Sequence, residues 1–159
     1  MYMDHLLKLK QTIDALFGEG VSRYVPKETN IILSKKTGRI RTVHHKDNLL
    51  CTLRIDGGLA ITTYFAQMLL NSKKFKENCL IVNNDAAPFV KDGKSVFCKH
   101  VVWSGKNIRI SADTPILFED KVIAVGRAVL SSEMINDFKK GVAVKVRDSL
   151  KSRNEEISS

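Results

Sequence analysis

Apolar residues recur at helical spacing near the start of the chain, with lysine, glutamine and aspartate on the opposite side. The apolar positions are Leu6, Leu9, Ile13, Leu16 and Phe17. Asp4 suits the N-cap position, and Gly18 and Gly20 provide a stop. The pattern predicts an amphipathic helix over residues 3–17 that covers one face of a small sheet.

Shorter apolar runs follow, several of them alternating with polar residues, and these predict β-strands. The expected strands are 21–25, 30–34, 39–43, 49–55 and 59–63, followed by a short helix over 64–70. Residues 71–78 are polar and charged, which is typical of a linker. We therefore expect a domain boundary near residue 77.

From residue 79 onward, short runs of β-branched residues alternate with turn signals. The expected strands are 79–82, a long strand over 95–103, 116–118, 122–130 and 142–146, with a turn at 113–115. One helix is expected after Asn84 or Asp85, with Ala86, Phe89 and Val90 facing inward and Gly93 at its end. A second helix is expected after Ser131 or Ser132, with Gly141 at its end. Residues from 149 onward are expected to fray.

The charge balance bears on partners more than on fold. Among 159 residues, 26 are basic and 17 acidic, a net charge of +9. Such a protein is attracted to polyphosphates, although a basic surface can also serve solubility alone. The three cysteines are far apart and form no Cys-x-x-Cys motif, which argues against a disulfide framework or zinc site and suits a reducing cytoplasm. No signal-peptide pattern or run of about 20 apolar residues is seen, so we expect no membrane association.

A basic cluster without acidic residues lies in the first half of the chain and comprises Lys35, Lys36, Arg39 and Arg41. On a strand the two arginines would share one side, roughly 6–7 Å apart, and could span neighbouring phosphates. The alternative is a solvated strand face paired with acidic residues elsewhere. His44 and His45 are adjacent, so on a strand they point to opposite faces and cannot bind one metal together.

Motifs of catalysis are lacking: the sequence contains no G-x-S-x-G, P-loop, H-E-x-x-H or dinucleotide fingerprint. Two pairs of carboxylates are close in sequence, Asp85 with Asp92 and Glu119 with Asp120. We interpret them as helix-cap and turn residues. No catalytic residue, metal or cofactor is therefore expected.

Four segments carry a resemblance to a known family. They are DAAPFVKDGK (85–94), SVFCK (95–99), AVGRA (124–128) and FKKGVAVK (138–145), and they resemble the PUA domain, a compact RNA-binding β-barrel. With TGRIR (37–41), the resemblance extends into the domain that precedes PUA in archaeal tRNA-guanine (archaeosine) transglycosylases. It implies an α+β protein: a small helix-plus-antiparallel-sheet domain over 1–77, a PUA-type barrel over 78–150 and a polar tail over 151–159.

The resemblance also implies an RNA-binding surface made by the first helix of the barrel, the glycine corner after it and the closing strands. At the matching positions stand Lys91, Gly93, Lys94, Ser95, Lys99, Gly126, Arg127, Lys145 and Arg147. A glycine corner lets a phosphate approach the backbone closely, and lysines neutralise it. Phe97 and Trp103 could stack on unpaired bases, but in a small barrel we expect both in the core.

The function that the resemblance implies is the binding of structured RNA, most of all tRNA near its acceptor end, by a cytoplasmic archaeal accessory protein. The catalytic barrel of the transglycosylases needs about 250 residues, so we expect this chain to be non-catalytic and a separate catalytic subunit to exchange the base. One alternative is a PUA protein associated with the ribosome and translation initiation. Another is a small independent RNA-modifying enzyme.

Overall fold

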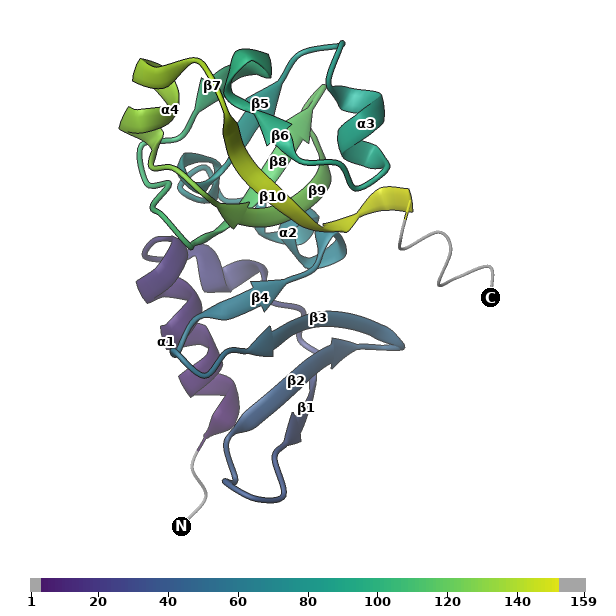
Figure 1. The fold of residues 1–159 in the computed structure, drawn as a ribbon. Coiled ribbons are helices and arrows are strands. Elements are labelled where there is room, and N and C mark those ends of the chain that lie inside the picture. The colour runs from purple at the N-terminus through teal and green to yellow at the C-terminus, as the bar shows by residue number, and fades with distance from the viewer. Residues whose placement is uncertain (1–3, 152–159) are drawn as a thin grey trace. The chain divides into compact units, whose positions relative to one another are not determined.

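The computed structural model describes residues 4–151, which form two compact units, one ending at Phe75 and the other beginning at Lys76 (Figure 1). The domain bounds expected from the sequence, 1–77 and 78–150, stay a prediction about separately folding parts. Apart from Lys151, the expected polar tail lies outside the described residues.

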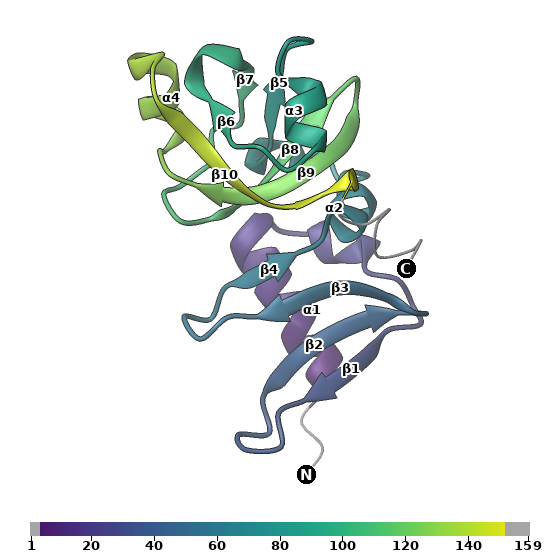
Figure 2. The same ribbon diagram turned by 45° about the vertical axis from the view of Figure 1, so that its right-hand side comes forward.

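The first unit is a four-stranded antiparallel sheet, in the order β1-β2-β3-β4, with helix α1 against one face (Figure 2). Its elements are α1 His5–Phe17, the 3-10 helix η1 Val21–Tyr24, β1 Asn30–Leu33, β2 Ile40–His45, β3 Asn48–Leu53, β4 Leu59–Ile61 and α2 Thr63–Leu69. Its core includes side chains of α1 and the sheet: Leu9, Ile13, Phe17, Val43, Leu50, Cys51 and Ile61. This is the expected helix-plus-sheet architecture.

Helix α1 begins as predicted. The Asp4 carboxylate accepts a hydrogen bond from the Leu7 N–H at 3.0 Å, and the Gly18 N–H donates to the Asp14 carbonyl at 2.9 Å at the other end. Leu16, expected on the buried face, is exposed. Since only every third or fourth position faces the sheet, the apolar side is narrower than the pattern suggested.

The expected strand over 21–25 is wrong, because Val21–Tyr24 forms a 3-10 helix. Gly20 precedes it with φ +88°, and the Asp14 carboxylate accepts a hydrogen bond from the Ser22 N–H at 2.8 Å. These local contacts turn the chain where side-chain alternation favoured a strand.

The expected linker over 71–78 is also structured. Phe75 is fully buried, and its ring meets that of Phe17 edge-to-face at 5.4 Å between centroids. It begins a second 3-10 helix, η2 Phe75–Asn78. One aromatic anchor within a charged segment therefore holds the end of the first unit in place.

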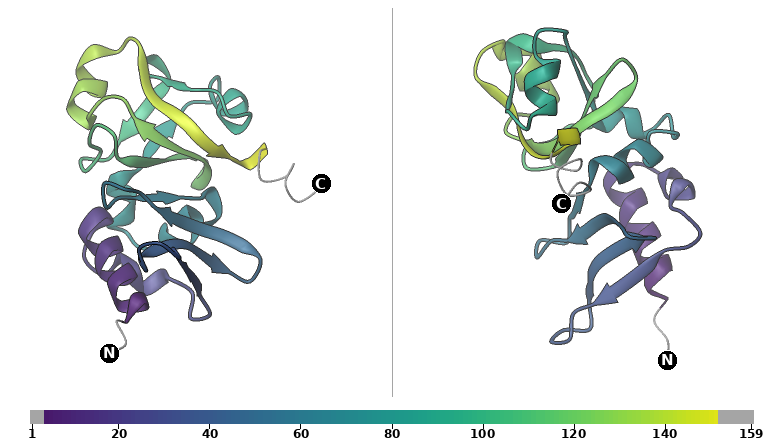
Figure 3. Two further views of the ribbon diagram at one scale, coloured as in Figure 1. Left: turned by 60° about the horizontal axis from the view of Figure 1, so that its bottom comes forward. Right: turned by 90° about the vertical axis from the view of Figure 1, so that its right-hand side faces the viewer.

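The second unit is a six-stranded, nearly closed barrel with the strand order β6-β10-β9-β8-β5-β7 (Figures 1 and 3). Its elements are β5 Leu80–Val82, α3 Ala87–Lys91, β6 Val96–Phe97, the 3-10 helix η3 Cys98–His100, β7 Val101–Ser104, β8 Asp113–Phe118, β9 Lys121–Ala128, α4 Ser132–Phe138 and β10 Val142–Ser149. Strands β6 and β7 stand at opposite ends of this order yet are joined only by η3. The sheet must therefore curl round on itself. The expected α+β fold with a C-terminal barrel is confirmed.

The long strand predicted over 95–103 is thus two strands with η3 between them. On β7, Val101 pairs with Val82 and Trp103 with Ile81, so Val102 is a bulge that shifts the alternation. Phe97 and Trp103, expected in the core, are 45% and 36% exposed.

Four further expectations need correction. Residues 113–115 do not form a turn but begin β8, and β10 continues to Ser149, which is buried rather than frayed. Helix α3 is preceded by Asn83, whose side chain accepts from the Ala86 N–H at 3.0 Å, instead of a cap at Asn84 or Asp85. Phe89, expected inside, is exposed.

The expected second helix, α4, begins with Ser131 as its N-cap, where Ser131 Oγ accepts from the Met134 N–H at 3.4 Å. Its C-cap is Lys139 in the left-handed conformation, two residues before the expected Gly141. No helix within residues 4–151 is long and apolar enough to cross a membrane.

Candidate nucleic-acid interface

The corner after α3 is shaped by Gly93, which has φ +94°. Its N–H donates to the Val90 carbonyl at 2.9 Å, and the Lys94 N–H donates to the Phe89 carbonyl at 2.9 Å, so the corner is hydrogen-bonded and well defined. A Cβ added at Gly93 would meet only Ser149 Oγ, at 3.7 Å. The glycine is therefore required by its backbone conformation, and space above it is open.

The lysines at this corner differ in their surroundings. Lys91 and Lys94 are both exposed, and Lys91 Nζ lies 5.6 Å from the centroid of the Phe118 ring. Within residues 4–151, Lys94 has no ion-pair partner. Lys94 is thus the lysine most available to an external phosphate at this corner, with half-buried Ser95 beside it in the chain.

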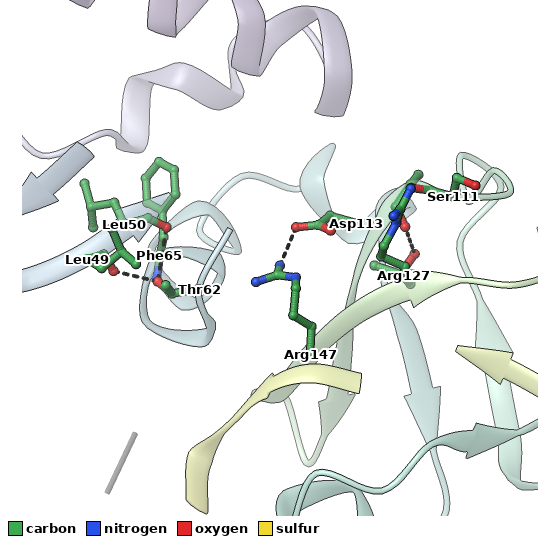
Figure 4. A network of polar contacts seen from close by, with 10 residues as sticks. Leu49, Leu50, Thr62, Phe65, Ser111, Asp113, Arg127 and Arg147 are labelled. Carbon is green, nitrogen blue, oxygen red and sulfur yellow. Dashed lines mark hydrogen bonds and ion pairs between the residues drawn. The ribbon is translucent and has the colours of Figure 1, made fainter. Parts of the chain in front are cut away.

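A row of charged residues crosses three strands of the barrel. Asp113 on β8 lies opposite Arg127 on β9, and Arg127 lies opposite Lys145 on β10. Both cations are exposed, and Arg127 Nε donates to the Ser111 carbonyl at 3.4 Å (Figure 4). Like charges directly opposite one another destabilise a sheet.

The nearby carboxylate does not neutralise this pair. Asp113, with a side chain 1% exposed, accepts a hydrogen bond and ion pair from Arg147 Nη2 at 2.7 Å (Figure 4). On β10, Val146 pairs with Gly126 and Asp148 with Val125, so Arg147 is a bulge residue. A role for Arg147 in contacting RNA stays a prediction, while its contact with Asp113 is structural.

Gly126 was expected on the binding surface but is buried. A Cβ there would lie 2.2 Å from the Lys145 carbonyl oxygen, which is backbone and cannot move aside. Gly126 is therefore required for the close approach of β9 and β10 rather than for contact with a ligand.

Lys99 lies on η3 and lines a hollow together with residues of α4, unlike Lys91 and Lys94 near α3. The predicted surface is therefore divided: the α3 corner holds Lys91, Gly93, Lys94 and Ser95, and the β9–β10 face holds Arg127 and Lys145. Gly93 lies close to Ser149 on β10, which links the corner to the end of that strand.

The secondary basic cluster belongs to the first unit. Lys35, Lys36 and Arg39 lie in the turn between β1 and β2, and Arg41 lies on β2. All four are exposed, while Ile40 and Val43 of β2 are buried, which is the expected alternation.

The two histidines on β2 differ in their contacts. His45 Nδ1 lies 2.9 Å from the Glu28 carbonyl oxygen, whereas His44 Nδ1 is buried without a hydrogen-bond partner in the described part of the chain. No cluster of three or more His, Cys, Asp or Glu residues suited to a metal occurs among residues 4–151.

All three cysteines, Cys51, Cys79 and Cys98, are buried and form no disulfide. Burial raises the pKa of the Cys79 thiol far above its ordinary value, although nearby Lys76 opposes the shift. Burial also raises the pKa of Cys98. The thiols of Cys79 and Cys98 therefore stay protonated at neutral pH and act as small apolar groups.

Sequence reasoning missed the exposed aromatic side chains of the second unit: Phe89, Phe97, Trp103 and Phe138. Lys76 Nζ lies 5.5 Å from the centroid of the Trp103 ring. The signal available in the sequence was the number of lysines beside these rings, which indicates surface positions. The hollow beside α4 was also missed, because it depends on the break in the strand over 95–103.

Comparison with known proteins agrees with this architecture. Residues 78–150 match the PUA domain, and residues 8–76 match the patch-forming domain C2 of tRNA-guanine transglycosylase. The tRNA-guanine(15) transglycosylase of Methanobrevibacter smithii is 36% identical over 151 residues, which are 93% of this chain and 23% of that protein. That of Thermoplasma volcanium is 33% identical over 145 residues, again 23% of its length.

Solved structures show the same fold at lower identity. A hypothetical protein from Pyrococcus horikoshii matches with a TM-score of 0.73 and 16% identity, covering 100% of this chain and 98% of that one. A conserved PUA domain protein from Thermoplasma acidophilum matches with a TM-score of 0.55 and 19% identity, covering 88% and 89%. The chain spans about a quarter of the curated relatives' length, 23%, and that quarter is their C-terminal part. The chain therefore consists of a patch-forming C2 domain followed by a PUA domain, and it belongs with the C-terminal part of the archaeal tRNA-guanine(15) transglycosylases.

Proposed function

We propose that this chain binds structured RNA, tRNA in particular, through the β9–β10 face and the α3 corner of its PUA domain. The observation that carries the proposal is the excess of cations on β9 and β10. Arg127 and Lys145 lie directly opposite each other, and the nearest paired carboxylate, Asp113, is taken by Arg147. Such a pair is unfavourable alone and becomes favourable when a phosphate lies between or above the two charges.

The α3 corner supports the same proposal. Lys94 is exposed beside Gly93, whose missing side chain leaves the backbone open. Two groups of cations on one domain suit contact with successive phosphates of an RNA backbone, which positions a duplex without reading its bases.

The choice of tRNA as the partner rests on homology. The relatives are named as transglycosylases acting on tRNA, and this chain matches the part of them that contains the C2 and PUA domains. In our proposal the chain acts as an accessory that holds tRNA in the cytoplasm, while a transglycosylase catalytic domain exchanges the base.

The carboxylates considered for catalysis support a non-catalytic role for these two domains. Asp92 is exposed and forms an exposed ion pair with Lys151 at 3.8 Å. Glu119 and Asp120 form the two-residue turn between β8 and β9, with φ +51° and +63°. Each of these three carboxylates is accounted for by a surface contact or a turn.

The test is the affinity of the purified chain for a tRNA transcript, measured by fluorescence anisotropy at several salt concentrations. If the four cations of this surface, Lys91, Lys94, Arg127 and Lys145, each neutralise a phosphate, the slope of log K against log salt is about −3. Lys145→Glu should weaken binding at least tenfold and reduce the slope by about 1 or more. Lys106→Glu, an equal charge change at an exposed loop position outside the surface, is the control.

An equal loss of affinity in both variants would refute the proposed surface, because only net charge would then matter. Preference for ribosomal RNA over tRNA would instead support the alternative of a translation-associated protein. Base exchange on unmodified tRNA by the purified chain would contradict the accessory role.

A further inference from the structure

A hollow of about 380 Å³ lies beside α4 in the second unit, and of the predicted RNA-binding residues Lys99 alone lines it. Its walls come from η3, the start of β7 and the end of α4. The lining residues are Cys98, Lys99, Val101, Ile135, Asn136 and Lys139. The volume is at the lower end of the range for small-molecule sites, roughly 300–1,000 Å³.

The amide of Asn136 is oriented by neighbours outside the hollow. The Ser104 hydroxyl donates to Asn136 Oδ1 at 3.1 Å and lies 2.8 Å from Ser132 Oγ. Since the carbonyl oxygen is used, the free end of the amide is its Nδ2, which has no hydrogen-bond partner within residues 4–151. Asn136 therefore offers a donor.

Lys139 stands at an unusual backbone position for a lysine. It is the C-cap of α4 with φ +53°, in the left-handed region where glycine or asparagine is favoured. A glycine, Gly141, lies only two residues later in the chain, yet the cap position itself holds a lysine.

The residues that line the hollow carry positive charge and no negative charge. Lys99 comes from η3 and Lys139 from the end of α4, Asn136 adds an amide donor, and no carboxylate lines the hollow. Cys98, Val101 and Ile135 supply an apolar part, and Cys98 stays a neutral thiol. Cations beside an apolar surface match a ligand with an anionic group attached to a flat, weakly polar body.

We propose that this hollow binds a nucleoside phosphate, with the phosphate between Lys99 and Lys139 and the base against Val101 and Ile135. Inorganic phosphate alone would leave the apolar part unused. The nucleotide can come from two sources, an unpaired nucleotide of an RNA held by the same domain or a free nucleotide, and the experiment below distinguishes them.

The test is a titration of the ¹⁵N-labelled chain with cytidine 5′-monophosphate, with cytidine and inorganic phosphate titrated separately, followed by amide chemical shifts. The monophosphate should shift amides of residues 98–101 and 135–139 at lower concentration than either fragment. Lys139→Asn should weaken it about tenfold, since one charge-assisted contact is lost. Asparagine tolerates the left-handed backbone, so the variant should fold.

The matched control is Lys140→Asn, which removes the same charge one residue further along the chain. The side chain of Lys140 does not line the hollow. It should change the affinity by less than about twofold, since an exposed charge outside the site acts only through screened attraction. The proposal would be overturned by an equal effect of the two variants, by an absence of shifts at residues 98–101 and 135–139, or by an equal affinity for inorganic phosphate.

The two sources separate when the monophosphate is added to the complex with tRNA. If the hollow is already occupied and the monophosphate no longer binds, the ligand is a nucleotide of the RNA. If both bind together, it is a free nucleotide. Failure of the chain to bind tRNA, with monophosphate binding intact, would refute the proposed function and leave this site standing.

Discussion

Replacing Arg147 with methionine removes the cation that forms an ion pair with the buried Asp113 carboxylate. Methionine keeps the apolar stem and approximate length of the arginine, so the change isolates the charged head. We expect the PUA domain to lose stability and to keep most of its affinity for RNA, because Arg147 points to Asp113 rather than outward.

The magnitude follows from burial. A hydrogen bond to a charged group contributes about 1.5–3 kcal/mol, and breaking a fully buried ion pair costs about 3–5 kcal/mol. Asp113 is 1% exposed but Arg147 is 35% exposed, so water screens part of the interaction. We expect a loss of about 2–3 kcal/mol, or a decrease in Tm of roughly 10–20 °C for a domain of this size.

The assay is thermal unfolding followed by circular dichroism, with tRNA affinity measured on the same samples. Lys145→Met is the matched control, since Lys145 lies two residues earlier on β10 and has no ion-pair partner among residues 4–151. It should change stability by less than about 0.5 kcal/mol and should weaken RNA binding. The two variants should thus show opposite profiles.

A second change checks the cause. Asp113→Asn combined with Arg147→Met should recover part of the lost stability, because a neutral amide is less costly to bury than an unpaired carboxylate. An unchanged Tm for Arg147→Met, together with a tenfold loss of tRNA affinity, would refute the reasoning and return Arg147 to the binding surface.

Three further outcomes are expected. Gly126→Ala should lower the Tm of the PUA domain by several degrees in thermal melts, since the new Cβ meets the Lys145 carbonyl at 2.2 Å. Phe75→Ala should cost about 3–5 kcal/mol in urea unfolding, because it empties a buried site against Phe17. The raised pKa of Cys79 means that the folded state holds this proton more tightly, so its contribution to stability is complete below the ordinary thiol pKa of about 8.5 and declines at higher pH by up to about 1.4 kcal/mol per unit. Cys79→Ala should reduce that decline in urea midpoints measured at pH 8 and 9.5.

Much of the fold could be predicted because local signals and topology agreed. The Asp4 cap and the stop at Gly18 defined α1, and the stop at Gly93 defined the end of α3. The resemblance to PUA then supplied the barrel, which no periodicity alone could have shown. Sequence reasoning was reliable at these cap and glycine positions, because the backbone there restricts which residue types fit.

The errors come from positions where alternation is interrupted. Val102 and Arg147 are bulge residues, and a bulge changes the alternation of side chains along its strand. Trp103, which follows the first bulge, is 36% exposed instead of buried, and Arg147, in the second, contacts Asp113 while its role in RNA binding stays a prediction. A bulge depends on the partner strand, so it has no signature in the strand's own sequence.

Strand β10 carries both a structural cation, Arg147, and a cation available to an external anion, Lys145. The Asp113 carboxylate lies opposite Arg127 across the β8–β9 pair but is bound by Arg147 of β10. The pair of Arg127 and Lys145 therefore keeps its charge for an external anion. The domain therefore gains a structural ion pair and retains an unneutralised cation pair from the same short stretch of chain. Deleting Val146 would shift the register of β10 at this point. It should lower both the Tm of the domain and its affinity for tRNA.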